Sequence, residues 1–375
     1  MKSIPRTRLL AAILAGLAGS ACAQSSVTLF GMLDANVGRF TGAAAGVTPA
    51  DVPALHQDAS GLSTSYWGMR GVEDLGGGLS ANFELQSFLR NDTGQPGRSN
   101  AICAGPPAPA PACSAVNVAD DPFFSKAAFV GLGSTTWGRV RLGQITTSLF
   151  ISSTSSNAFG DSTSFSPINL LMFIGSPLAG GTGWNNSVAY DSPNLSGFNF
   201  NLQKSFSEGS KGGNAGGRIA YSGGPFSVSA AYTDVKKDPV TFSDGTTRNN
   251  TKNSLFALSY DLPFMKVFGH VGRIKSDGSG TATPTDDNIT HRIWDLSVVV
   301  PVGYGRLMAG YGTRTGNETF ASKRALASVG YAYSLSKRTD LYALLRNDKN
   351  RAQGTTALAP QAQGTSYAVG IRHFF

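Results

Sequence analysis

Few side chains in this sequence are of the types that do chemistry, and their spacing forms no recognised catalytic or metal-binding pattern. The chain has four histidines, and none lies in an H-E-x-x-H or another paired-ligand arrangement. These are His56, His270, His291 and His373. Neither a G-x-S-x-G nucleophile elbow nor a Gly-rich phosphate loop is present. We therefore expect a protein that is not an enzyme, with no catalytic residues, no metal and no cofactor.

The first 23 residues have the composition of a cleaved signal peptide. Lys2, Arg6 and Arg8 form a basic start, an apolar stretch follows over 9–19, and 21–23 (Ala-Cys-Ala) offers a cleavage site. Cys22 could instead carry a lipid, but the residues before it lack the Leu of a lipoprotein signal. Removal of the segment lowers the net charge from +8 to +5. The remaining charge is scattered, which argues against a nucleic-acid partner.

Cleavage leaves two cysteines, Cys103 and Cys113, in a predicted long loop over 91–124. The residues between them are mostly Ala and Pro, and this spacing without a nearby His does not suit zinc. An exported protein enters an oxidising compartment, where a disulfide between the two is favoured. Two free thiols are the alternative.

The charged residues follow a pattern that is typical of β-strands. Over 79–90, apolar residues such as Phe83 and Leu85 alternate with polar ones such as Glu84, and no charge falls on the apolar side. Stretches of about ten residues with this alternation recur, as a tilted membrane-spanning strand requires. Strands are expected at 27–38, 63–73, 79–90, 126–132, 138–145, 185–191 and 197–206, with further hairpins towards the C-terminus.

The last ten residues, 366–375, alternate in the same way and stop at an aromatic residue. Tyr367, Val369, Ile371 and Phe375 are separated by small or polar residues, apart from Phe374. The terminal residues of soluble domains usually fray. A strand that ends on Phe instead suits the closing strand of a membrane barrel, where aromatic residues lie at the membrane–water interface.

Short turns alternate with long loops along the chain, as in a barrel with a periplasmic and an outer rim. Polar loops are expected at 236–250, 276–288 and 349–364. No stretch of eighteen apolar residues exists, and only 14% of residues are charged. We predict an all-β transmembrane antiparallel barrel of about sixteen strands over 24–375, wide enough for an aqueous channel. A soluble exported β-sandwich is the alternative.

Four segments resemble general porins of Gram-negative bacteria, in particular the β-proteobacterial type. They are 25–31 (SSVTLFG), 67–78 (WGMRGVEDLGGG), 186–193 (NSVAYDSP) and 370–375 (GIRHFF). The resemblance implies a homotrimeric, sixteen-stranded outer-membrane channel for passive diffusion of small hydrophilic solutes and ions. It also implies contact with outer-membrane lipid and lipopolysaccharide, and recognition of the terminal strand by the barrel assembly machinery.

In the family that this chain resembles, the third long loop folds into the lumen. Here that loop is 147–184, and it carries five consecutive large apolar residues at 170–174. Water would cover such a run on a surface loop, whereas the barrel wall would shelter it. We therefore expect 147–184 to form the constriction. Packing of the loop on a neighbouring subunit is the alternative.

Alternation along the strands predicts which charged and aromatic residues face the lumen, where they would select ions through their field. These residues are Tyr66, Arg70, Glu84, Lys126, Arg139 and Arg141. The resemblance matches Lys126 and Arg70 to basic wall residues that face an acidic loop. Asp161 is the only acidic residue of the loop, so it is the expected opposing charge.

The chain departs from the family pattern at Tyr66, Gly183 and Ala189, where relatives often carry Arg. Fewer basic residues should weaken an anion preference, so we expect weak anion selectivity. Two other functions remain open. One is a substrate-specific channel whose lumenal binding site includes Tyr66 and the run 170–174. The other is a structural or adhesive barrel with a plugged lumen that does not conduct.

Overall fold

The structure is a computed structural model of the chain. It describes residues 26–41, 55–97, 122–173, 181–207, 212–236, 240–241, 247–279, 288–316, 321–353 and 362–375. The predicted signal peptide, 1–23, and the predicted disulfide partners Cys103 and Cys113 lie outside these ranges. Both therefore stay predictions.

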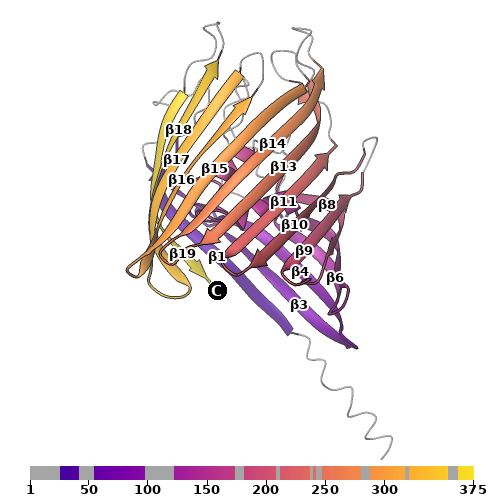
Figure 1. The fold of residues 1–375 in the computed structure, drawn as a ribbon. Coiled ribbons are helices and arrows are strands. Elements are labelled where there is room, and N and C mark those ends of the chain that lie inside the picture. The colour runs from indigo at the N-terminus through magenta and orange to yellow at the C-terminus, as the bar shows by residue number, and fades with distance from the viewer. Residues whose placement is uncertain are drawn as a thin grey trace, which may run out of the picture.

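Sixteen long antiparallel strands in the described ranges form a closed barrel, as predicted (Figure 1). The long strands are β1 (Ser26–Arg39), β3 (Tyr66–Gly76), β4 (Leu79–Arg90), β6 (Ala127–Ser134), β7 (Gly138–Thr146), β8 (Gly183–Asp191), β9 (Phe198–Ser205), β10 (Ala215–Gly223), β11 (Phe226–Val235), β13 (Thr247–Asp261), β14 (Lys266–Ser279), β15 (Asn288–Val302), β16 (Gly305–Gly316), β17 (Ala321–Ser334), β18 (Thr339–Gln353) and β19 (Ala362–Phe374). Three short strands, β2 (His56–Asp58), β5 (Gln95–Pro96) and β12 (Val240–Thr241), add local pairings.

The barrel closes because β1 pairs on both of its edges. Ser26 to Met32 pair with β3, and Met32 to Arg39 pair with β19. The sheet therefore has no free edge in its described part, and its backbone groups are satisfied within the protein.

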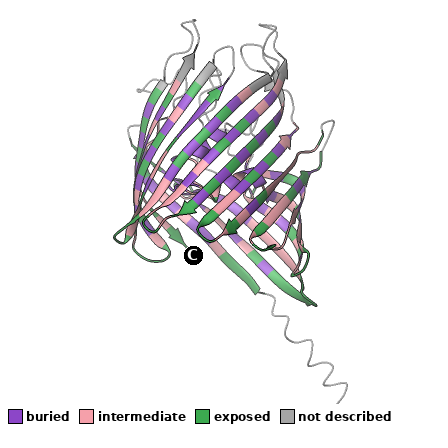
Figure 2. Ribbon diagram, viewed as in Figure 1, coloured by how far each residue is buried: buried purple, intermediate pink, exposed green. Residues whose placement is uncertain are grey.

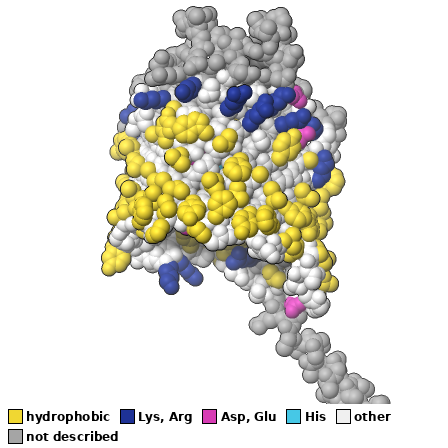
Figure 3. All heavy atoms as spheres, viewed as in Figure 1, with side chains coloured by type: hydrophobic (Ala, Val, Ile, Leu, Met, Phe, Trp, Pro, Cys, Tyr) yellow, Lys and Arg dark blue, Asp and Glu magenta, His cyan; other side chains and the backbone are white. Residues whose placement is uncertain are grey.

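Side chains alternate between the two faces of the wall, as the sequence pattern requires. Along β13, for example, Leu255 is 2% exposed while its neighbour Phe256 is 49% exposed. Figure 2 shows the same alternation on the neighbouring strands. The outward apolar side chains form a continuous band around the visible side of the barrel (Figure 3). A band of this kind matches the hydrocarbon layer of a membrane.

Several strands are longer than predicted, and the predicted loops next to them are shorter. β13 already begins at Thr247, β14 runs to Ser279 and β18 runs to Gln353. The expected loops 236–250, 276–288 and 349–364 are therefore partly strand. Backbone pairing continues past the apolar band with polar residues, because hydrogen bonds between strands do not depend on side-chain hydrophobicity.

The second predicted strand begins later than expected, at Tyr66 rather than at residue 63. The preceding segment is held by a side chain instead of a strand. The carboxylate of Asp34, which is buried on the inner wall, accepts hydrogen bonds from the backbone N–H groups of Gly61 (3.1 Å) and Ser63 (2.9 Å). A buried carboxylate competes well for backbone donors, so the chain turns inward here before it pairs.

The C-terminus is part of the barrel seam. The backbone N–H of Phe375 donates to the carbonyl of Gly31 (3.1 Å), and the N–H of Gly31 donates to the carbonyl of Phe375 (3.2 Å). The ring of Phe375 covers Gly31, where an added Cβ would lie 2.5 Å from that ring and 2.7 Å from the carbonyl oxygen of Tyr66. Gly31 is thus required by close packing at the point of closure.

Two short helices, α2 (Ser148–Thr154) and α3 (Pro167–Met172), lie in the connection between β7 and β8. In the described part of the chain no helix has the length and apolar character needed to cross a membrane.

We predict that Gly31→Ala destabilises the barrel by about 1–3 kcal/mol, because the new methyl group meets backbone and ring atoms that cannot both move. Gly269→Ala is the matched control, since the nearest atom to its added Cβ is 4.0 Å away. A strand Gly with room for Ala should gain about 0.5–1 kcal/mol. Urea unfolding in detergent micelles measures the free energy of unfolding of both variants. Equal midpoints for the two variants would show that the seam does not need Gly31.

Candidate functional site

The third long connection, between β7 and β8, lies inside the barrel over its described part, 147–173. Helix α2 packs against β10, β11 and β13, and α3 packs against β14 to β17. The loop therefore covers the inner wall on one side of the barrel. Its part 158–165 also packs on side chains of β18 and β19 and on the segment 60–62. The wall beside β3 and β4 is left open.

Hydrogen bonds within the loop give it a defined shape. Thr147 and Ser166 cap the two helices, accepting from the N–H groups of Phe150 (3.3 Å) and Asn169 (3.4 Å). The side-chain amide of Asn169 donates to the carbonyls of Gly160 and Ser162, both at 3.0 Å. These internal hydrogen bonds hold the side chains of the loop at fixed positions.

The apolar run of the loop is buried in the barrel interior, as predicted for 170–173. Leu170, Leu171 and Met172 are at most 4% exposed. They belong to a cluster with side chains that point inward from β13, β14, β15 and β17, namely Leu255, Ile274, Ile293 and Leu326. Packing of these residues on a neighbouring subunit is excluded, because their own barrel covers them. For the same reason, the suggestion that 170–173 form a solute-binding surface is wrong.

Three buried arginines of the inner wall hold the backbone of the loop. Arg314 and Arg324 donate to the carbonyls of Leu171 and Leu170, each at 3.3 Å, and Arg346 donates to the carbonyl of Ser164. Asp348 balances the charge of Arg324 through two hydrogen bonds of 3.0 and 2.6 Å. These charge-assisted hydrogen bonds are buried. A buried charge is stabilised only when its partners are well placed, so these bonds favour one position of the loop backbone.

A cavity of about 340 Å³ remains between the loop and the open side of the wall. Aromatic and charged side chains from distant parts of the chain meet here. Its lining residues are Met32, Ser63, Tyr66, Phe88, Lys126, Thr146, Phe150, Thr154, Asp161, Thr182, Arg372 and Phe374. Three of the predicted site residues, Tyr66, Lys126 and Asp161, are thus brought together at this narrow part of the lumen.

The cavity is flanked by two basic wall residues, while Asp161 comes from the loop. The ammonium group of Lys126 lies 4.0 Å from the centre of the Tyr66 ring and also donates to the side chain of Gln86. Arg372 donates to Ser63 (2.8 Å) and to the carboxylate of Asp340 (2.6 Å). The charge of Arg372 is therefore partly balanced.

Lys126 reaches the lumen for a reason that differs from strand alternation. Ala127 pairs with Gln86, and both are buried on the inner side, whereas Val130 and Leu132 are exposed on the outer side. Alternation alone would thus point residue 126 outward. Lys126 lies just before β6 begins. Its backbone N–H bonds to the carbonyl of Gln86 (3.1 Å), and its long, flexible side chain turns inward to the side chain of the same residue.

Arg70 and Glu84 lie on the inner wall but do not line the cavity. They are direct partners on β3 and β4, nearer to the short turn that joins these strands. The guanidinium of Arg70 lies 4.8 Å from the centre of the Phe30 ring, and Glu84 accepts a hydrogen bond from Gln86. This pair contributes charge to the lumen away from its narrow part.

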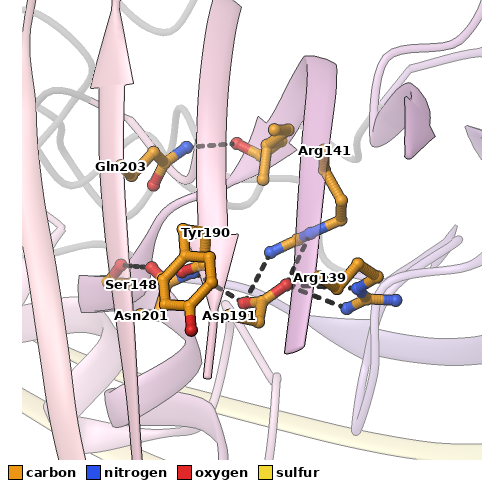
Figure 4. Close-up of polar contacts among 8 residues, drawn as sticks. Arg139, Arg141, Ser148, Tyr190, Asp191, Asn201 and Gln203 are labelled. Atoms are coloured by element: carbon orange, nitrogen blue, oxygen red, sulfur yellow. Dashed lines mark hydrogen bonds and ion pairs between the residues drawn. The ribbon is translucent and has the colours of Figure 1, made fainter. Parts of the chain in front are cut away.

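Arg139 and Arg141 form a separate cluster around Asp191, which the sequence reading did not single out (Figure 4). Arg141 binds both carboxylate oxygens of Asp191, at 2.8 and 3.0 Å, and Arg139 binds one of them at 3.1 Å. Asn201 donates to the same carboxylate at 2.7 Å, and Ser148 of α2 contacts Asn201. Two cations thus share one anion, so this cluster keeps one positive charge.

Sequence reasoning overlooked Arg372 and the three anchoring arginines. Arg372 shows a signal that could have found it, since it alternates with the outward Ile371 on the terminal strand. Arg314, Arg324 and Arg346 show the same alternation, but nothing in the pattern indicates that the loop would cover them. No group of three or more His, Cys, Asp or Glu side chains in the described ranges could hold a metal ion.

Comparison with known proteins identifies the family. Residues 10–353 match the model of the Gram-negative porin family. The chain belongs to this family. An outer membrane porin of Bordetella pertussis is 28% identical over 418 residues, covering 99% of this chain and all of the relative. Outer membrane porin protein 32 of Delftia acidovorans is 31% identical over 395 residues, covering 98% of this chain and 99% of the relative.

Solved porin structures have the same fold. The anion-selective porin from Comamonas acidovorans superposes with a TM-score of 0.72 at 28% identity, covering 94% of this chain and all of the solved one. OmpT of Vibrio cholerae, described in a trimer form, gives a TM-score of 0.63 at 13% identity, covering 94% of this chain and 99% of OmpT. The latter likeness concerns the fold only.

This porin is therefore an outer-membrane protein that forms a channel for passive diffusion. Its family and fold are those of channels. The narrow part of the lumen is the place where its preferences among solutes can arise.

We predict that Asp348→Ala destabilises this porin by about 3–5 kcal/mol, because the buried charge of Arg324 then loses the carboxylate to which it makes two hydrogen bonds. Asp261→Ala is the control. Its bond to Lys266 has a similar length, 3.1 Å, but both side chains are exposed, so less than about 1 kcal/mol should be lost. Denaturant unfolding in micelles gives the free energy of unfolding of both variants and of the unchanged protein. A loss at Asp348 no larger than the loss at Asp261 would contradict this account of the loop anchor.

Proposed function

We propose that small hydrophilic solutes and ions cross this porin between the inserted loop 147–173 and the wall of β1, β3, β4 and β19, with a weak preference for anions. The observation that carries the proposal is the one-sided position of the loop. Its helices pack against β9 to β17, its part 158–165 packs on β18 and β19, and the 340 Å³ cavity is left beside Tyr66 and Lys126. A loop that covered the whole wall would instead plug the lumen.

The proposed preference for anions follows from the charges that line this path. Lys126 and Arg372 face Asp161, and Asp340 is shared by Arg372 and Arg306, so three cations stand against two anions. Further along the lumen, Arg139 and Arg141 share Asp191. The excess of positive charge is small both at the cavity and at the Asp191 cluster. Since lumenal water and salt screen these fields, the preference should be weak. The anion selectivity of the Comamonas relative supports this direction.

A saturable binding site for organic anions is the second candidate. Four aromatic side chains line the cavity beside the two cations, and they are Tyr66, Phe88, Phe150 and Phe374. A solute with an apolar part and a carboxylate would find both contacts there. Such a site would make the current saturate as the solute concentration rises, whereas free diffusion would give a linear dependence.

We propose further that this porin assembles as a homotrimer and performs no chemistry of its own. The trimer form described for OmpT agrees with such an assembly. The outward side chains of the last strand, Tyr367, Val369 and Ile371, are exposed next to Phe375, as a signal for the barrel assembly machinery would require. The predicted disulfide Cys103–Cys113 remains part of the proposal for the loop 91–124.

Single-channel recording in planar bilayers tests the proposed function. We expect stable open channels that appear and close in three equal steps, because each subunit would conduct separately. The native protein in its own detergent extract is the sample, and heat-denatured protein is the control. Folded protein that inserts but gives no conductance would support the plugged barrel and contradict the proposal.

Charge changes at the cavity should shift the ion selectivity in opposite directions. Lys126→Gln should lower the anion-to-cation permeability ratio, and Asp161→Asn should raise it. A unit charge about 8 Å from a permeating ion in water contributes about 0.5 kcal/mol, which corresponds to about a twofold change. The effect should shrink as salt concentration increases.

The reversal potential in a salt gradient measures this ratio. Asp261→Asn, at the exposed end of β13 outside the cavity, is the matched control and should leave the ratio unchanged. Equal effects of Asp161→Asn and Asp261→Asn would mean that ions do not pass beside the cavity.

A further inference from the structure

A second segment of the chain is folded into the barrel, in the connection that leads from β1 to β3. Residues 59–65 of this connection are all buried, although four of them are Ser or Thr. Burying a polar segment is unfavourable unless its groups find hydrogen-bond partners. The partners of the segment 59–65 connect the barrel wall to the inserted loop 147–173.

Asp34 of β1 binds this segment on the side of the wall. Besides the N–H groups of Gly61 and Ser63, its carboxylate accepts a hydrogen bond from the hydroxyl of Tyr342 on β18. The backbone N–H of Asp34 donates to the hydroxyl of Ser65 (2.8 Å). An added Cβ at Gly61 would lie 2.1 Å from the hydroxyl oxygen of Tyr342, so only Gly fits there. The backbone of 61–65 is thus fixed against Asp34.

The other side of the segment binds the loop. The hydroxyl of Ser162 donates to the carbonyl of Gly61 (2.7 Å), and the hydroxyl of Ser164 donates to the carbonyl of Ser60 (3.2 Å). Ser162 directly follows Asp161, the acidic residue that lines the cavity. The hydrogen bonds of the segment therefore end next to the expected opposing charge of the constriction.

Apolar packing adds to these hydrogen bonds. Leu62, which is 2% exposed, belongs to one cluster with Phe159 and Phe165 of the loop and with Tyr342 and Leu344 of β18. The segment, the loop and the wall thus share one group of buried apolar side chains. Moving the segment would expose part of this group to lumenal water, which is unfavourable.

The segment also holds a cation of the cavity. Arg372 donates to the hydroxyl of Ser63 (2.8 Å), whose backbone N–H is bound by Asp34. Arg372 and Asp34 are direct partners on β19 and β1. Tyr66, whose ring contacts Lys126, follows the segment immediately in the chain. An acidic, a basic and an aromatic side chain of the cavity are therefore all joined to the segment 59–65.

We propose that Asp34 is a positioning residue for the ion selectivity of this porin. It acts through the segment 59–65, which sets the places of Asp161 and Arg372 on the two sides of the cavity. The inference rests on the proposed ion path beside this cavity. Asp34 is 0% exposed and does not line the cavity, so it touches no permeating ion. Its effect depends on distance, because the field of a displaced charge at the ion is weaker.

The loop has other anchors that do not depend on Asp34. Arg314 and Arg324 bind the carbonyls of Leu171 and Leu170. Loss of the Asp34 carboxylate should therefore loosen the part of the loop around Asp161 without removing α3 from the lumen. The expected result is an open channel with altered selectivity.

A double-mutant cycle in planar bilayers separates positioning from the direct field of Asp34. The effect of Asp161→Asn on the anion-to-cation permeability ratio is measured in the unchanged protein and in Asp34→Ala, from the reversal potential in a salt gradient. Independent fields would change the logarithm of the ratio additively. We expect about a twofold effect in the unchanged protein but only about 1.2-fold in Asp34→Ala, because a displaced charge is weaker and better screened. Only folded channels carry current, so lost stability alone does not alter the ratio.

Asp295→Ala is the matched background. Asp295 is also a buried carboxylate of the inner wall, 3% exposed, but it is bonded to His270 on β14 at 2.9 Å. Asp161→Asn should keep its twofold effect there. The same twofold effect in all three backgrounds would overturn the proposal.

Two further variants keep the test sharp if Asp34→Ala folds poorly. Asp34→Asn retains the oxygen that accepts from Gly61 and Tyr342 but loses the acceptor for Ser63, so an intermediate result is expected. The double variant Ser162→Ala, Ser164→Ala changes no charge and removes both hydroxyl contacts with the segment. In it, the effect of Asp161→Asn should fall to about 1.5-fold, since the apolar contact remains.

The control for the serine variant is Ser152→Ala, Ser153→Ala. Both serines are buried in the same loop, but Ser152 accepts from Arg218 on the wall (3.1 Å) and Ser153 donates to the carbonyl of Phe150 in its own helix (3.1 Å). Asp161→Asn should keep its full effect in this control. An equal reduction in both serine variants would contradict a specific role of the segment 59–65.

A spin label at residue 161 reports the position of the loop without ion flow. The label is attached to Asp161→Cys in full-length protein that also carries Cys103→Ser and Cys113→Ser. We expect an immobilised label in this protein, a more mobile label after Asp34→Ala, and no change after Asp295→Ala. A label that stays equally immobilised would overturn the proposal. A mobile label together with no effect of Asp161→Asn on selectivity in any background would contradict the proposed ion path but leave the positioning role of Asp34 standing.

Discussion

The structure depends on the pairing of β1 with two partners at once. Its first half completes the hydrogen bonds of β3 and its second half those of β19. In a bilayer no water can satisfy an exposed backbone N–H or C=O, so an open edge would be strongly unfavourable. The barrel must therefore be closed. At the seam, the close packing of Phe375 on Gly31 leaves no room for a larger side chain at residue 31. The apolar band, the lumen and the inserted loop all presuppose this ring.

Inside the ring, buried polar groups position the loop. Asp34 binds the segment before β3, while Arg314, Arg324 and Arg346 on β16 to β18 bind loop carbonyls. These groups are buried. Asp34 accepts from backbone N–H groups, and the arginines donate to backbone carbonyls. A half-paired arrangement would be costly, so such contacts favour one position of the loop over others. The position of the loop in turn fixes where solutes can pass.

Charge is distributed differently on the two faces of the wall. On the inner face, acidic and basic side chains nearly balance, as around Asp191, which suits a path that many small solutes can use. On the outer face of β13 to β15, Lys252 lies opposite Lys275 and Arg273 opposite Arg292. Since successive residues of a strand point to opposite faces, neighbouring positions can carry different charges independently.

The sequence alone determined the fold class, the alternation of the faces and the presence of a loop too apolar for water. Each of these follows from local period and composition, and β4, at Leu79–Arg90, begins and ends where predicted. Only the tertiary structure decided which charges meet. Lys126 turns inward because its strand starts one residue later, and the run 170–173 is covered by the wall rather than exposed to solutes. Such outcomes depend on contacts between residues far apart in the chain, which no local pattern encodes.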